Sequence, residues 1–143
     1  MSALLHDRDF YTWTHQQADL LREGRFNELD SDHLIEELES MGARERRELG
    51  NRLAVLLAHL LKWKYQPERS GNSWRRTIKI QRIDIKDLLA DNPGLKSELG
   101  EIFAKAYRKA RVLAADETQF DEAAFPDESP FAFQEVLNLE FLP

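Results

Sequence analysis

The chain of 143 residues contains no cysteine. This absence excludes disulfide bonds, thiol catalysis and thiolate metal sites, and it fits a reducing cytoplasm. No run of about 18 apolar residues occurs, so the sequence predicts no membrane span. The charged segment from His6 to Asp9 predicts that no signal peptide is present. Glycine-rich phosphate loops, Gly-x-Ser-x-Gly elbows and dinucleotide fingerprints are also missing, which favours a protein without catalytic activity and without a cofactor.

The residues that are present predict an all-α fold. Apolar side chains recur at the three-to-four spacing of a helix over about residues 7–23, 30–66, 73–91 and 92–117. No segment alternates with the period of two that is typical of strands. With 42% apolar and 32% charged residues, the chain is predicted to form a single helical domain over residues 1–143. We expect an antiparallel bundle of about five helices.

The second periodic segment contains a glycine in its middle. Leu34, Ile35, Leu38 and Met41 predict its buried side, and the apolar stripe resumes in phase at Leu49. A glycine inside a helix costs about 1 kcal/mol relative to alanine. We therefore expect a break or a kink near residues 40–44.

The C-terminal segment is rich in aromatic residues. Five of the eight phenylalanines lie within the last 24 residues, among acids and beside Pro126 and Pro130. A disordered acidic tail would be poor in aromatic side chains. We therefore expect an ordered aromatic tail that packs over the helices, or alternatively docks onto a second subunit of a homo-oligomer.

Basic residues are concentrated in one region of an acidic chain. Residues 62–86 contain eight basic and two acidic side chains, whereas the whole chain has a net charge of −6. Arg75, Lys79, Arg82 and Lys86 follow one another at steps of four, three and four, so they are predicted to form one basic ridge. Pairing of this ridge with the protein's own acids, such as Glu98 or the tail, is the simplest interpretation.

The same region joins two predicted helices and combines tryptophan, tyrosine and arginine, which are enriched at binding hot spots. Our preferred hypothesis is a non-catalytic protein-interaction module whose partner is not identified by the sequence. The candidate binding residues are Trp63, Lys64, Tyr65, Gln66, Arg69, Trp74, Arg75, Lys79 and Arg82. Weak nucleic-acid binding through the ridge at residues 75–86 is an alternative, which the acidic pI of about 5.3 disfavours.

Several stretches resemble a known family. They are residues 9–14 (DFYTWT), 36–42 (EELESMG), 59–67 (HLLKWKYQP), 73–78 (SWRRTI) and 141–143 (FLP). Together and in this order they resemble the bacterial domain-of-unknown-function family 29. The resemblance implies an all-helical, single-domain bacterial protein, and it supplies no catalytic residue, substrate or cofactor.

A second resemblance concerns only two residues. Arg52 and His59 are seven positions apart on one predicted helix, a spacing similar to the motif of the HEPN superfamily of helical ribonucleases. In that superfamily the arginine holds phosphate and the histidine transfers a proton at the ribose 2′-hydroxyl, which suits the two side chains. The motif usually has a polar residue after the arginine, where this chain has Leu53. Arg52 and His59 are therefore candidates for an alternative, nuclease function.

A metal site is not expected from the sequence. Helical bundles that bind two metal ions use Glu-x-x-His motifs, and this chain contains none. The single Asp30-x-x-His33 lies at a predicted helix start, where both residues are ordinary capping residues.

Overall fold

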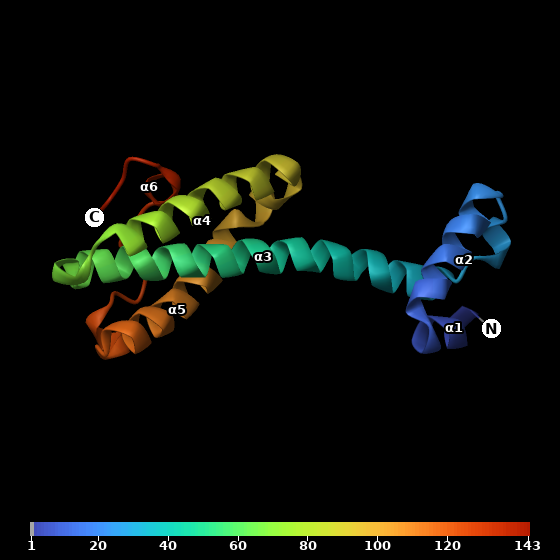
Figure 1. Ribbon diagram of the computed structural model, residues 1–143, viewed down its shortest axis with the longest axis horizontal. Coiled ribbons are helices and arrows are strands. Elements are labelled where there is room, and N and C mark those ends of the chain that lie inside the picture. The colour runs from blue at the N-terminus through green and yellow to red at the C-terminus, as the bar shows by residue number, and fades with distance from the viewer. Residues whose placement is uncertain (1) are drawn as a thin grey trace. The chain divides into compact units, whose positions relative to one another are not determined.

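The structure is a computed structural model that describes the backbone of residues 2–143 and the side chains of residues 5–143 (Figure 1). All its regular elements are helices, and residues 2–143 contain no strand. The predicted all-α fold is therefore confirmed. The chain divides into two compact units, residues 1–44 and residues 45–143, while a single domain over residues 1–143 stays a prediction.

The first unit contains α1 (Ser2–Arg8), α2 (Phe10–Arg22), the 3-10 turn η1 (Phe26–Glu28) and the start of α3 (Ser31–Tyr65). The helix predicted over residues 7–23 is thus interrupted at its start. Asp9 adopts a non-helical conformation, and its carboxylate accepts a hydrogen bond from the Thr12 N–H at 3.1 Å. This N-cap satisfies a free backbone donor of α2, so α1 and α2 are separate helices.

The buried side predicted for residues 34–41 is wrong at three positions. Ile35, Leu38 and Met41 are 54%, 65% and 56% exposed. Within the first unit, α1 and α2 contact Asp30, which precedes α3, and they contact His33 and Glu37 at the start of α3. Ile35 and Leu38 lie off that contact on the helix surface, and Met41 lies one turn beyond it.

The predicted break near Gly42 is absent, because α3 is one helix from Ser31 to Tyr65. Apart from its chain neighbours and the nearby backbone of the helix itself, nothing lies within 4 Å of the position that a Cβ would occupy at Gly42. No close packing therefore requires a glycine at this position, and Gly42 destabilises the helix only by its intrinsic cost of about 1 kcal/mol relative to alanine. Its neighbours Glu39, Arg44, Glu45 and Arg46 are strong helix formers, and they offset that cost.

The second unit is a bundle of the later part of α3 with α4 (Asn72–Asp91) and α5 (Leu99–Thr118). Arg52 of α3 pairs with Asp84 of α4, and Trp63 meets Trp74. Later residues of α3 thus contact earlier residues of α4, so the two helices run antiparallel, as predicted (Figure 1). The 3-10 helix η3 (Pro93–Glu98) occupies the predicted first turns of the last long helix.

The predicted apolar stripe of α3 forms the centre of this bundle. Leu49, Leu53, Leu57 and Leu61 are all fully buried. Each such leucine contributes roughly 1.5–3 kcal/mol by leaving water. Residues Ile78, Ile85, Leu89, Ile102, Ala106 and Ala110 complete the core from α4 and α5.

The aromatic tail is ordered and packs on its own chain. It contains the turn η4 (Glu122–Ala124) and the short helix α6 (Phe133–Leu137), which lies beside the first half of α4 (Figure 1). Phe125 and Phe131 are buried, and Phe133 packs edge-on against Phe103 of α5. The prediction of an ordered tail is confirmed. Among residues 2–143, no helix combines the length and the apolar character needed to cross a membrane.

Candidate functional site

The corner between α3 and α4 is braced by its aromatic side chains. After Tyr65 the chain turns through the 3-10 helix η2 (Pro67–Arg69) and enters α4 at Asn72. The Trp63 and Trp74 rings lie 6.3 Å apart between centroids. The Arg75 guanidinium lies 5.3 Å from the Trp63 ring centroid, a cation–π contact. Trp63 is only 9% exposed, so it belongs to the core, contrary to the prediction that it binds a partner.

Two more of the predicted binding residues contact the tail of the protein itself. Tyr65 packs edge-on against Phe125 at 5.3 Å, and the Lys64 ammonium lies 5.9 Å from the Phe131 ring centroid. Gln66 is half-buried at the end of the helix, while Arg69 is exposed. The aromatic residues of this corner therefore hold the tail and the turn in place.

Behind the corner lies a buried cation that the sequence did not single out. The Lys62 side chain is 6% exposed, and its ammonium donates to the Glu117 carboxylate of α5. The same ammonium lies 4.7 Å from the Trp74 ring centroid. Lys62 stands in an almost continuous apolar stretch, which is a sequence signal for burial, but its partner is 55 residues away. This pair links α3 to α5.

His59 is half-buried next to this pair. Its Nδ1 lies 2.9 Å from the Val55 carbonyl oxygen, which can only accept, so Nδ1 carries the proton and Nε2 is the acceptor. Burial lowers the pKa of His59, the Val55 carbonyl opposes this, and the nearby Lys62 charge lowers it further. His59 is therefore neutral at pH 7.

We predict that His59 makes the fold less stable in acid. The ordinary pKa of histidine is 6.5, so below this pH His59 becomes protonated in the unfolded chain but stays neutral in the folded one. The free energy of unfolding therefore falls as the pH drops toward the lowered pKa of His59 in the folded state. Urea denaturation from about pH 8 to about pH 5 measures this on wild type and His59→Asn, whose amide can still donate to Val55. The free-energy difference between the two proteins should change with pH, in favour of the variant in acid. A constant difference would contradict a neutral buried His59.

Arg52 is engaged by carboxylates. Its Nε donates to Glu48 at 3.1 Å and its Nη1 to Asp84 at 2.9 Å. It lines a cavity of about 440 Å³ together with five acids and without His59. The acids are Glu45, Glu48, Asp84, Asp87 and Asp91. An acidic cavity repels phosphate, so the Arg52 environment disfavours the nuclease hypothesis, which stays a prediction.

Arg82 is not part of an exposed ridge, which corrects that prediction. It is 1% exposed, and its guanidinium donates to the carbonyls of Val136 and Phe141, at 2.8 Å in each case. Burial without a carboxylate partner lowers the pKa of its guanidinium. Arg82 therefore anchors the tail to α4. A sequence signal for this exists, because Arg82 follows the buried Ile78 by four positions and precedes the buried Ile85 by three.

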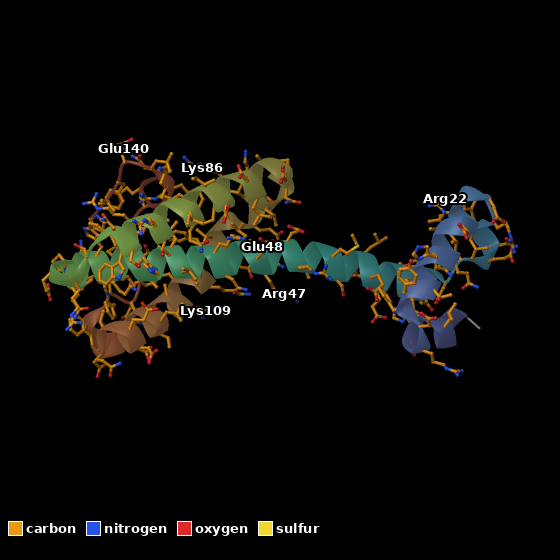
Figure 2. The ribbon with its side chains drawn as sticks, in the orientation of Figure 1. Arg22, Arg47, Glu48, Lys86, Lys109 and Glu140 are labelled. Atoms are coloured by element: carbon orange, nitrogen blue, oxygen red, sulfur yellow. The ribbon has the colours of Figure 1, made fainter. Side chains whose placement is uncertain are left out.

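Apart from Lys62, the other basic side chains of this region are exposed and have no carboxylate partner. Among the side chains of residues 5–143, none of these cations forms an ion pair with a carboxylate. Glu98 and Glu101 pair with Arg46 and not with the ridge. The predicted internal pairing of the ridge is therefore absent. The unpaired cations are Lys64, Arg69, Arg75, Arg76, Lys79 and Lys86, and we refer to them as the basic face. In Figure 2, Lys86 marks its far end on α4, and Glu140 marks the tail beside α4.

A cavity of about 320 Å³ opens where the basic face meets the tail. Three cations line it from α4, namely Arg75, Lys79 and Arg82. The tail adds the single acid Glu140, and apolar side chains come from Ile78, Leu139 and Leu142. Positive charge beside apolar surface can bind a ligand that is both anionic and apolar. The contribution of the tail was missed, because its lining residues lie more than 50 positions along the chain from those of α4.

A protein-family model matches residues 5–142, which is nearly the whole chain. The chain belongs to the family Domain of unknown function DUF29. The predicted resemblance is thereby confirmed. No curated protein and no solved structure matches the chain. Membership of DUF29 names no activity, so the argument for function depends on the basic face and its cavity.

Proposed function

We propose that this DUF29 protein is a non-catalytic interaction module that binds an acidic, partly apolar segment of a partner protein. The observation that carries the proposal is the basic face, whose six exposed cations have no carboxylate partner among the described side chains. Unpaired charges of one sign favour a partner of the opposite sign through electrostatic complementarity. The segment would lie along α4 and enter the cavity between α4 and the tail.

The chemistry of this surface favours a protein segment over nucleic acid. Binding of single strands usually requires aromatic side chains on which bases stack. Here Trp63 is buried, Tyr65 packs on Phe125, and the Trp74 ring is covered by the Lys62 ammonium. Ile78, Leu139 and Leu142 in the cavity suit leucine or phenylalanine side chains of a peptide.

We predict that reversing two charges of the basic face weakens this binding. The probe is a fluorescein-labelled peptide that alternates glutamate with leucine and phenylalanine, and its binding is followed by fluorescence anisotropy. The Arg75→Glu/Lys79→Glu variant should bind it about tenfold more weakly than wild type, or worse, at low salt. Added salt should weaken wild-type binding as well, because these charges are exposed.

The matched control is Lys96→Glu/Arg108→Glu, which changes the net charge equally at two exposed residues outside the cavity. It should bind the peptide nearly as wild type does, and circular dichroism should show that both variants remain helical. A labelled single-stranded oligonucleotide of equal charge provides the comparison. Tighter binding of the oligonucleotide, or equal losses in both double variants, would overturn the proposal.

We place this function in the bacterial cytoplasm as part of the same proposal. A chain without cysteine has no disulfide to form in an oxidising compartment, and helix packing and ion pairs stabilise each unit by itself. Fractionation of the native host with an antibody against the protein tests this placement.

A further inference from the structure

The first unit contains a cluster of histidines and carboxylates that the basic face does not involve. His6 of α1 and His33 of α3 stack with their ring centroids 4.0 Å apart and their planes inclined by 18°. Trp13 of α2 packs edge-on against His6 at 4.7 Å. The two histidines are 27 positions apart, so no sequence motif joins them.

His33 has the partner that orients a metal-binding histidine. Its Nδ1 lies 2.8 Å from Asp30 Oδ2, and the same oxygen accepts from the Trp13 indole N–H at 3.0 Å. An ionised Asp30 fixes the His33 tautomer with the proton on Nδ1, which leaves Nε2 with a free lone pair. Metal-ligating histidines are held in this way by a carboxylate behind them.

His6 lies between two carboxylates. Its Nε2 is 2.7 Å from Glu37 Oε1, and its Nδ1 is 3.1 Å from Asp7 Oδ1. Protonated at both nitrogens, the imidazole donates to both carboxylates, and a bound metal cation would replace the proton on one nitrogen. If Nε2 donates to Glu37, then Nδ1 and the Asp7 oxygen face that cation together. Their separation of 3.1 Å is close to the roughly 3.3 Å between two ligands of one tetrahedral zinc ion.

We propose that His6, Asp7 and His33 bind one divalent transition-metal ion such as zinc. One ligand atom from each residue lies within 4.8 Å of the other two. Two imidazoles and one carboxylate suit zinc and its first-row neighbours, whereas calcium and magnesium prefer oxygen ligands alone. Because the two ring planes are nearly parallel, one imidazole must turn out of the stack before both lone pairs reach one ion, with water as the fourth ligand. The ion would clamp α1 onto the start of α3.

The test is a titration of the full chain, treated with EDTA and exchanged into metal-free buffer, with zinc chloride in a calorimeter. We expect one zinc ion per chain. His33→Gln and Asp7→Asn should each weaken binding about 10- to 100-fold or more. Asp7 is 71% exposed in its side chain, so Asp7→Asn removes a ligand without threatening the fold.

The matched control is His15→Gln, which removes an exposed histidine of α2 outside the cluster. It should bind zinc as wild type does. Cobalt supplies a second readout, because a nitrogen- and oxygen-ligated site in the wild type should give visible absorption bands that His33→Gln lacks. Absence of zinc binding by wild type, or binding that His33→Gln and Asp7→Asn leave unchanged, would overturn the proposal.

Discussion

Replacing Arg82 by methionine should destabilise the protein by about 2–4 kcal/mol. Methionine fills most of the volume of the arginine side chain but donates no hydrogen bond. The carbonyls of Val136 and Phe141 would then lose their donor. A buried acceptor without a partner costs about 1–3 kcal/mol.

Removing the buried charge of Arg82 also has a stabilising effect. A buried guanidinium without a carboxylate is itself unfavourable, as the lowered pKa of Arg82 shows, and removing it returns part of that desolvation cost. The carbonyls stay buried, however, because Val136 is fully buried against the bundle. The loss of the two hydrogen bonds therefore outweighs the relief. Arg82→Lys should rescue little, because a single ammonium lacks the planar fork that reaches both oxygens.

Urea denaturation measures the change in the free energy of unfolding, and hydrogen exchange locates it. Amides of residues 133–141 should exchange much faster in Arg82→Met, because α6 loses its attachment to α4. Arg76→Met, at an exposed position of the same helix, is the control and should change stability by less than about 0.5 kcal/mol. If Arg82→Met is as stable as this control, the tail is held by its phenylalanines alone.

The basic ridge shows which features of α4 could be predicted from the sequence and which could not. Helical spacing correctly placed Arg75, Lys79 and Arg82 on adjoining parts of one surface. It could not tell which of them is covered, because the covering segment lies 53 to 59 positions further along the chain. Periodicity is a local signal, whereas burial of a polar side chain depends on a distant partner.

The apolar pattern of the sequence predicted the buried face of α3 correctly in the second unit but not in the first. In the second unit, α3 lies against both α4 and α5, so its leucine stripe is buried as the spacing predicted. In the first unit, the same kind of stripe continues through Leu38 and Met41, which are exposed. The pattern indicates which face is apolar, but burial also requires another element beside it. The histidine cluster escaped prediction for a similar reason, because α1 and α3 contribute to it from separate positions in the sequence.

Removing the carboxylate of Glu117 should destabilise the protein by about 2 kcal/mol, because it leaves the buried Lys62 ammonium without its counter-charge. Full burial of both partners would give a larger loss, but the Glu117 side chain is 45% exposed, and water can partly replace it. The Trp74 ring would remain as a weaker partner, since a cation–π contact contributes only about 0.5–2 kcal/mol. The contact between α3 and α5 should therefore loosen, but the bundle should remain folded.

A double-mutant cycle measured by urea denaturation separates this pair from simple packing. Lys62→Met keeps the volume and removes the charge, so it should cost less than Glu117→Ala. Once Lys62 is methionine, adding Glu117→Ala should cost almost nothing, which gives a coupling energy of about 1–2 kcal/mol. The control cycle uses Lys105→Met and Glu101→Ala, an exposed pair on α5 with 3.5 Å between its charged atoms, where coupling should stay below about 0.5 kcal/mol. Equal coupling in both cycles would mean that burial of Lys62 does not strengthen its bond to Glu117, and the link between α3 and α5 would then depend on their apolar contacts.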